Sequence, residues 1–469
     1  MGTGLSLGAA LGMGATASAA DFTVTNTAPS GGGSLADAVA LAEGAAGPDR
    51  VLFQAGLSGT VTLGSTLQVS QPLEILGPGA SALTVSGNNT VRVLNIDTAT
   101  GADVKVSGLN LINGHSTSDG GVMSTVDADL TIQGAVISGG TADLGAGVYS
   151  NLGTTSIQDS TIAGNTATGE GGGVYSLDAN LEVIRTTVSG NGAPANGFGG
   201  GIDTKNAQTL IQASTVSGDS AGNGGGVRTL NSDLGIQNST ISGNTATGTG
   251  GGSGFGYGGG LWLDAGASGS MIVYGSTFAN NHAAAGGGIS ADASASNGLA
   301  STVVADNTAP GSPELRSAGA DPYKLAFSLV ESTTGASVVD IAPFTGSNIL
   351  GVDPQLGPLA ANGGPTRTQQ PALTSPLVDK AFSVGGPMDQ RGSLRPFDVA
   401  SIPNSTAPMA DGSDIGAFEL QAADFATPPG QTPATPTAPA KSRCKKKQKK
   451  AKRGAAAAKK KKCKKKKRK

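Results

Sequence analysis

The chain has 469 residues, of which 76 are glycine, 4% are aromatic and 14% are charged. Glycine is about twice as frequent as in ordinary proteins but follows no Gly-X-Y period, which excludes a collagen triple helix. The net charge of −2 conceals a split, because residues 441–469 hold 19 of the 31 basic residues and none of the 33 acidic ones. The chain is therefore an acidic body with a strongly basic tail.

Residues 1–20 have the pattern of a secretory signal peptide. Leu5–Ala15 is apolar and small, and Ala17-Ser18-Ala19 has the small-x-small form of a cleavage site. The basic start of such signals is missing, so the true start could lie upstream of Met1. A flexible Gly/Ala terminus is the alternative. We expect export, with no transmembrane span in the mature chain.

Residues 21–100 predict an N-terminal cap followed by the first turns of a solenoid. Short apolar strands between Asp21 and Ile96 are separated by Gly, Pro and Asn. Ser34–Glu43 predicts one amphipathic helix, which Ser34 can cap and Gly44 can end. A single helix at this point would cover the open apolar end of the solenoid.

Residues 101–310 repeat one pattern, a glycine run followed by a segment such as Ser239-Thr-Ile-Ser-Gly-Asn-Thr-Ala246. The residue that closes this segment recurs about every 26 residues, and the Gly248–Gly260 insertion, expected as a loop, lengthens one step. Such a period indicates a solenoid. We predict an all-β, right-handed, single-stranded parallel β-helix, three short strands per turn. The recurring positions are Asn113, Gly140, Asn165, Asn191, Asp219, Asn244, Asn281 and Asn307.

These recurring residues are interpreted as architectural rather than ligand-binding. The Asn column can form a ladder of side-chain hydrogen bonds along the axis, and Asn tolerates the left-handed backbone of a sharp bend. The glycine runs serve a second bend, where a side chain would clash. An inward apolar stack is expected from Ile162, Val188, Val216, Ile241 and Phe278.

A more variable column follows each glycine run. It comprises Met123, Tyr149, Tyr175, Asp203, Arg228, Trp262 and Ser290. Strand alternation points this position outward. We expect Tyr149 to stack on Tyr175 and Asp203 to pair with Arg228. An exposed row of this kind suits a polysaccharide chain lying along the axis, with Tyr149, Tyr175, Asp203, Arg228 and Trp262 as the candidate glycan-binding residues. The alternative is cross-turn packing that only stabilises the sheet.

Residues 311–420 break the period and predict an irregular C-terminal cap. Asp389, Arg391, Arg395, Asp414 and Glu419 could form a charge-paired cluster that closes the solenoid, with a functional site as the alternative. Residues 421–440 are rich in Pro and Thr and predict an extended linker.

Residues 441–469 predict a disordered Lys-rich tail. In an exported protein this tail should bind an anionic cell-wall polymer or lipid surface. Nucleic acid would be the partner only of a cytosolic protein, and a merely solubilising tail is the alternative. Cys444 and Cys463, the only cysteines, lie in the tail, where they could pair, cross-link two chains or stay free.

Three segments carry a resemblance to bacterial surface proteins. Phe22–Thr27, Gly33-Ser-Leu35 and Leu73–Gly79 resemble the opening of exported β-helix proteins of the pectin-lyase-like class. The pair Ser276–Asn281 and Gly-Gly-Gly-Ile289 is similar to the repeats of polymorphic outer membrane proteins. Residues 353–419, which end in Asp414-Ile-Gly-Ala-Phe-Glu419, resemble the choice-of-anchor Q domain. The resemblance implies a secreted or surface-held β-helix without a known activity, although a Lys-rich tail replaces the usual sorting signal.

A β-helix also permits a polysaccharide lyase or glycoside hydrolase. The repeats hold few bases (Arg185, Lys205 and Arg228), and His115 and His282 lie far apart. Glycoside hydrolysis needs two carboxyl groups about 5–10 Å apart across a bound sugar, a distance that sequence cannot supply. The regularly spaced Asp of Ca²⁺-binding repeats is absent. We therefore expect an adhesin-like structural protein at the bacterial cell surface, without catalytic residues, metal or cofactor.

Overall fold

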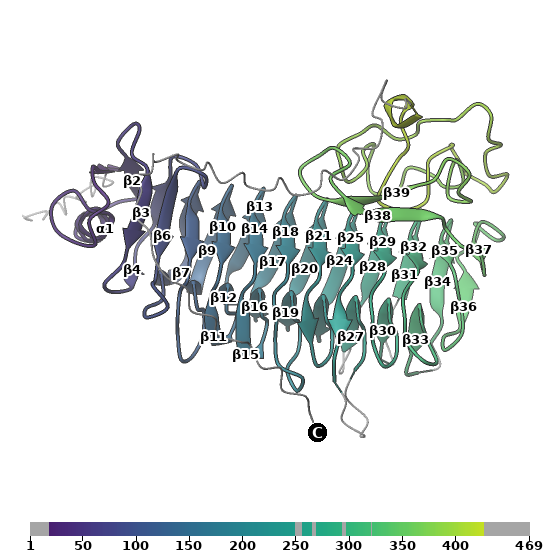
Figure 1. The fold of residues 1–469 in the computed structure, drawn as a ribbon, viewed down its shortest axis with the longest axis horizontal. Helices are drawn as coiled ribbons and strands as arrows, with labels where there is room; N and C mark the ends of the chain where they lie inside the picture. The colour runs from purple at the N-terminus through teal and green to yellow at the C-terminus, as the bar shows by residue number, and fades with distance from the viewer. Residues whose placement is uncertain (1–17, 249–255, 265–268, 293–296, 320, 426–469) are drawn as a thin grey trace, which may run out of the picture. The chain divides into compact units, whose positions relative to one another are not determined.

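The computed structural model describes residues 18–248, 256–264, 269–292, 297–319 and 321–425. These residues form a parallel β-solenoid of about 11 turns, as predicted (Figure 1). Each regular turn carries three strands, and strands one turn apart pair in parallel register. Residues 1–17 of the predicted signal peptide, residues 249–255 of the glycine-rich insertion, the predicted linker beyond Phe425 and the basic tail with its cysteines lie outside the described residues. No helix within these ranges is long and apolar enough to cross a membrane.

The strands stack into three ladders along the solenoid axis. The first ladder contains β4 (Leu67–Val69), β7 (Leu94–Ser107), β9 (Met123–Gln133), β12 (Val148–Asn151), β16 (Val174–Leu177), β19 (Ile202–Lys205), β23 (Val227–Leu230), β27 (Leu261–Asp264), β30 (Ile289–Ala291) and β33 (Leu315–Ser317). The second contains β1 (Asp21–Val24), β2 (Asp49–Phe53), β5 (Leu73–Leu76), the later parts of β7 and β9, β13 (Thr154–Gln158), β17 (Asn180–Ile184), β20 (Gln208–Gln212), β24 (Asp233–Gln237), β28 (Met271–Tyr274), β31 (Asn297–Ala300), β34 (Tyr323–Ala326) and β36 (Val338–Asp340).

The third ladder consists of shorter strands. It contains β3 (Gly59–Thr62), β6 (Leu83–Ser86), β8 (Asn110–Ile112), β10 (Val136–Ser138), β14 (Thr161–Ala163), β18 (Thr187–Ser189), β21 (Thr215–Ser217), β25 (Thr240–Ser242), β29 (Thr277–Ala279), β32 (Val303–Ala305), β35 (Leu329–Val330) and β37 (Ile349–Leu350). Smaller parallel pairs are β11 (Thr141–Leu144) with β15 (Thr166–Glu170), and β22 (Ser220–Ala221) with β26 (Thr245–Ala246).

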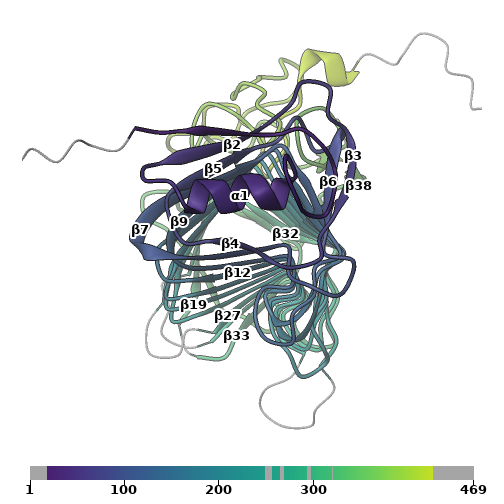
Figure 2. The same ribbon diagram turned by 90° about the vertical axis from the view of Figure 1, so that its left-hand side faces the viewer.

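The predicted N-terminal helix is confirmed as α1 (Leu35–Glu43). The Ser34 side chain accepts a hydrogen bond from the Asp37 backbone N–H, and Gly44 follows as the C-cap. Leu35, Ala38, Val39 and Ala42 are buried. Figure 2 shows α1 lying across the end of the solenoid. The helix therefore covers the apolar interior at this end.

The interior of the third ladder is the predicted apolar stack. Ile162, Val188, Val216, Ile241 and Phe278 are fully buried and lie in register on successive turns. A neighbouring side chain of similar size meets each of them along the axis. The core is thus a column of contacts repeated turn by turn, which is the packing expected of a solenoid.

The predicted asparagine ladder is confirmed at the bend after the third ladder. The Asn165 side-chain NH₂ donates to Asn191 Oδ1 (2.9 Å), and the Asn191 side-chain NH₂ donates to Asp219 Oδ1 (2.9 Å). The same contact joins Asn244 to Asn281 (3.0 Å) and Asn281 to Asn307 (2.9 Å). These side chains are buried, so the hydrogen bonds satisfy polar groups that water does not reach.

The ladder residues themselves do not adopt the left-handed backbone expected of them. Except at Asn113, the positive φ belongs to the residue just before the ladder position, as at Gly164 (64°), Gly190 (64°) and Asn280 (60°). The bend is thus made one residue earlier, at a position where Gly or Asn adopts a positive φ with little steric strain. Because the ladder residue is released from the bend, its side chain can point inward.

The glycine runs lie where adjacent turns approach closely, as predicted. A Cβ on Gly172 would lie 2.4 Å from the Gly192 carbonyl oxygen, and one on Gly173 would lie 2.5 Å from the Gly201 carbonyl oxygen. The same close approach recurs at Gly200, Gly225 and Gly259. Glycine is therefore required here by the spacing between turns, independently of any ligand.

The prediction that the irregular cap begins at residue 311 is wrong, because residues 311–350 continue the solenoid as β33 to β37, whose strands pair in parallel with the preceding turns. The irregular C-terminal segment, residues 351–425, packs along the side of the solenoid (Figure 1). It contains the antiparallel pair β38 (Leu356–Ala360) and β39 (Thr368–Pro371), and ends in a 3-10 turn, η1 (Ala422–Phe425). Gln421–Phe425 thus belong to the folded unit rather than to the linker predicted from residue 421. The segment contacts turns from Ala213 to Ser301. The predicted cap therefore clamps several turns laterally.

Replacing Gly173 by Ala should destabilise the solenoid because the new Cβ would collide with the Gly201 carbonyl oxygen. We expect the free energy of unfolding to fall by about 1–3 kcal/mol, the usual cost of overpacking. Denaturant titration followed by circular dichroism measures this change. Gly311→Ala is the matched control, since no atom lies within 4 Å of its Cβ position; equal stability of the two variants would contradict the close-approach argument.

Candidate functional site

The variable column of the first ladder is largely in the predicted register. Tyr149, Tyr175, Asp203, Arg228, Trp262 and Ser290 occupy equivalent positions on successive strands. Met123 does not belong to this set. It aligns with the inward-facing Val148 and is fully buried, and Ser124 aligns with Tyr149. The prediction failed there because Val122 stands in the place of the third glycine, which shifts the count by one residue.

The expectation that this column is exposed is wrong. The exposed fractions are 7% for Tyr149, 3% for Tyr175, 0% for Asp203, 4% for Arg228 and 7% for Trp262. Their side chains point away from the solenoid core, yet loops that lead to the glycine runs cover them. Ring contacts show this cover: Phe198 lies 5.8 Å from the Trp262 ring centroid, and Tyr257 lies 6.2 Å from it. Sequence alternation gives a direction but does not reveal what lies above the side chain.

The predicted stacking of Tyr149 on Tyr175 is present. Their ring centroids are 5.7 Å apart and the planes differ by 4°. Burial raises the pKa of Tyr149 to about 12, so both hydroxyls stay neutral at ordinary pH. Lys205 lies over the Tyr175 ring at 5.2 Å and pairs with Glu170, the last residue of β15. The ion pair of Lys205 and Glu170 therefore covers the stacked tyrosine rings.

The predicted pairing of Asp203 with Arg228 is also present, and it is shared. The Arg228 guanidinium donates to Asp203 Oδ1 (3.2 Å) and to Asp264 Oδ2 (2.9 Å). Its carbon lies 4.6 Å from the Phe198 ring centroid. Burial raises the pKa of Asp203 to about 6, although the neighbouring Arg228 opposes the shift. Asp203 and Arg228 are therefore paired within the protein and do not face solvent.

Arg316 continues the same column, and sequence reasoning missed it. It aligns with Ser290 and donates to Ser290 Oγ and to Asp292 Oδ1, each at 2.9 Å. Its guanidinium lies 3.9 Å from the Tyr257 ring centroid. The Trp262 indole N–H also donates to Asp292, at 3.3 Å. No glycine run precedes Arg316, so only the period of about 26 residues could have indicated it.

An open groove lies elsewhere, on the outer face of the second ladder. It has a volume of about 590 Å³ and crosses five successive strands. We call it the outer groove. It is lined by Thr154, Asn180, Leu181, Glu182, Gln208, Thr209, Leu210, Asp233, Leu234, Gly235, Ser270 and Ile272.

The floor of the outer groove results from a missing side chain. Leu210, Gly235 and Ile272 lie in one outward-facing column. A Cβ on Gly235 would meet Leu210 Cδ1 at 3.5 Å, an ordinary contact distance. Ile272 is 44% exposed, so the groove offers apolar surface to solvent. Amide and carboxyl side chains border this surface, namely Asn180, Gln208 and Asp233.

The outer groove combines features that suit a neutral polar polymer. Its apolar floor can contact the C–H faces of a ring, and its amides and carboxylates can bond hydroxyl groups. The strands are spaced about 4.8 Å apart, so equivalent side chains repeat along the axis. Within the described ranges, no group of three or more His, Cys, Asp or Glu side chains is placed to hold a metal ion.

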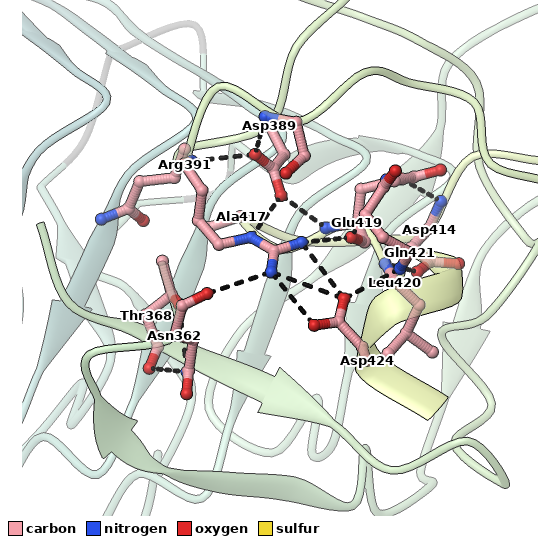
Figure 3. Close-up of polar contacts among 12 residues, drawn as sticks. Asn362, Thr368, Asp389, Arg391, Asp414, Ala417, Glu419, Leu420, Gln421 and Asp424 are labelled. Carbon is pink, nitrogen blue, oxygen red and sulfur yellow. Dashed lines mark hydrogen bonds and ion pairs between the residues drawn. The ribbon is translucent and has the colours of Figure 1, made fainter. Parts of the chain in front are cut away.

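The five predicted residues of the C-terminal cluster lie together, as Figure 3 shows for four of them. Arg391 Nε donates to Asp389 Oδ2 (2.9 Å), and Arg395 Nη1 donates to Glu419 Oε2 (3.1 Å). Asp414 accepts the backbone N–H groups of Asp379 and Leu420, both at 2.8 Å. The cluster therefore holds remote parts of the C-terminal segment together.

The cluster has two features that the sequence pattern did not indicate. Arg391 also pairs with Asp424 (3.4 Å) and lies 3.5 Å from the Phe418 ring centroid. Burial raises the pKa of Asp414, and the nearby Glu419 carboxylate adds to this shift; burial also raises the pKa of Glu419, although Arg395 opposes it. Every member except Arg391 is at most 6% exposed, so this arrangement supports the structural interpretation.

Gln390 joins the cluster to the solenoid. Its side-chain NH₂ donates to the Ser214 carbonyl (3.1 Å) and to Thr215 Oγ1 (3.0 Å), and its Oε1 accepts from Thr240 Oγ1 (2.6 Å). A second cavity of about 310 Å³ lies beside this contact, between the bend at Arg185 and residues 385–392.

Comparison with known proteins yields a likeness of fold. No protein-family model and no curated protein matches the chain. Among solved structures, the crystal structure of pectate lyase Pel9A is similar with a TM-score of 0.46 and 12% sequence identity, over 86% of this chain and 96% of that one. At this identity a similar fold does not imply a similar activity.

Replacing Arg395 by Ala should strongly destabilise the C-terminal segment, because Glu419 would remain buried without its cation. We expect a loss of about 3–5 kcal/mol in the free energy of unfolding. Arg185→Ala removes an exposed pair with Asp159 and should cost about 0–1 kcal/mol. Denaturant unfolding of both variants provides the comparison. Equal losses in the free energy of unfolding would show that the buried ion pair stabilises the fold no more than the exposed one.

Proposed function

We propose that this protein is an exported, non-enzymatic rod that is held at the bacterial cell surface and binds glycan along its outer face. The outer groove carries the proposal, because it is the solvent-open surface that combines apolar floor and polar border across five turns. The buried column from Tyr149 to Trp262, expected to form the glycan site, is reassigned to packing because a polymer cannot reach it.

A non-enzymatic role is supported by the charged groups of the column, which bond one another inside the protein. Asp203, Arg228 and Asp264 bond one another, and Lys205 bonds Glu170. A general acid or base must come within about 3 Å of the substrate proton that it transfers. Asp203 and Arg228 are covered and therefore poorly placed for that work.

Surface retention is proposed to depend on the basic tail. Residues 441–469 carry 19 Lys and Arg residues and no acid. Each such residue near an anionic surface contributes about 1 kcal/mol. The resemblance of residues 353–419 to choice-of-anchor Q domains, and of the repeats to polymorphic outer membrane proteins, supports a surface location for the rod.

Filling the outer groove should abolish glycan binding. Gly235→Gln places a long side chain on the floor, and Gly235 has no positive φ, so the backbone accepts the change. On a glycan array, we expect binding to fall by roughly tenfold or more, which corresponds to about 1.4 kcal/mol.

Gly298→Gln is the matched control for this experiment. Gly298 lies one strand beyond Ile272 in the same column but does not line the groove. Unchanged binding by the Gly235 variant would place any glycan site elsewhere. The same polysaccharides should show no new reducing or unsaturated ends after incubation with the protein; their appearance would support a lyase or hydrolase instead.

Deleting residues 441–469 should release the protein from intact cells. High salt should release the full chain as well, because salt screens attraction between exposed charges. The protein in the medium and on cells can be measured by immunoblotting. Retention under both conditions would contradict anchoring by the tail. If the deletion variant loses binding to washed cell-wall polymer but keeps binding to anionic vesicles, the polymer is the partner of the tail.

A further inference from the structure

Asp219 is the acidic member of an otherwise amide ladder. It lies between Asn191 on one turn and Asn244 on the next. Its Oδ1 accepts from the Asn191 backbone N–H (2.7 Å) and side-chain NH₂ (2.9 Å). Its Oδ2 is buried and has no hydrogen-bond partner. The position is 1% exposed, so bulk solvent does not reach this oxygen.

The neighbouring rungs show which group belongs at this Oδ2. The Asn191 NH₂ donates to the Ile162 carbonyl (3.0 Å) as well as to the next rung. The Asn244 NH₂ likewise donates to the Val216 carbonyl (3.0 Å) and to Asn281. Each ladder position therefore needs a donor that points at two oxygen acceptors.

By the same register, Oδ2 of Asp219 stands where the amide nitrogen would face the Val188 carbonyl and Asn244 Oδ1. An ionised carboxylate offers two acceptors and no donor. It would present a negative oxygen to two other oxygens in a buried site. A protonated carboxyl group has one O–H and can supply the missing donor.

Among the described residues, no cationic side chain lies beside Asp219 to balance its charge if it is ionised. The groups that face it are Asn191, Asn244, the backbone of Ser217 and the glycine turn at Gly201, and none of them ionises. Within the described residues, no charged side chain contributes to its pKa. Burial raises that pKa to about 8, and the hydrogen bonds from Asn191 oppose the shift.

We propose that Asp219 is a neutral carboxylic acid in the folded protein, and that its proton completes the ladder and makes the middle of the rod less stable as the pH rises from acid to neutral. The folded state then binds a proton that the unfolded chain releases near its ordinary pKa of about 3.9. The stabilisation is complete below that pH and is lost as the pH rises towards about 8. The inference is independent of glycan binding.

The test compares unfolding of the full chain with that of Asp219→Asn between about pH 4.5 and about pH 8. Asn restores the residue found at the other rungs, so the variant should fold. The ratio of the wild-type to the variant unfolding constant should rise by up to roughly tenfold for each pH unit. Asp321→Asn, which removes an exposed carboxylate, should follow the wild type. A ratio that does not change with pH would overturn the proposal.

Hydrogen exchange on the wild-type chain gives a second reading. The Asn191 backbone N–H donates to Asp219 Oδ1, and the Asp219 backbone N–H donates to Asn244 Oδ1. The Gly140 backbone N–H donates to Asn165 Oδ1, which lies two turns from Asp219, and serves as the reference. Protection of the first two amides should fall between about pH 5 and about pH 8, relative to that of Gly140. An equal pH dependence of the three amides would show that opening of this rung releases no proton and would reject the proposal.

Discussion

The constraint on which this structure depends is the strict register between successive turns. Parallel backbone hydrogen bonds join each strand to the strand one turn later, and the ladder through Asn191 and Asn244 repeats that register inside the bend. A side chain at one position therefore meets its equivalents above and below. Apolar residues become a continuous core, amides become a ladder, and ionisable residues become paired columns.

The same register explains why the variable column is internal to the protein. Glycine at positions such as Gly172 lets adjacent turns approach to distances that no Cβ would allow. The loops that lead into these bends then lie close against the first ladder, where Phe198 covers Arg228, while Lys205 of β19 lies over Tyr175. Stacked rings and shared ion pairs fill the space under the loops. This packing stiffens the rod and leaves the outer face of the second ladder as the open surface.

The C-terminal segment adds a second kind of constraint. Its inner structure depends on buried ion pairs around Arg391 and Arg395, and Gln390 bonds it to two turns of the solenoid. Buried pairs of this kind demand full satisfaction, because a missing partner leaves an uncompensated charge. The segment therefore contributes lateral bracing over several turns, whereas α1 covers the N-terminal end.

The sequence by itself determined the period, the strand ladders, the capping helix and the inward stack, since these follow from local spacing and from residue types repeated every turn. It also indicated that Tyr149 stacks on Tyr175 and that Asp203 pairs with Arg228. Only the tertiary structure decided that these residues are covered and that Gly235 opens a groove. It also placed the C-terminal segment along the side. These features depend on contacts between segments far apart in the chain, such as Gln390 with Thr240, and no repeat spacing encodes such contacts.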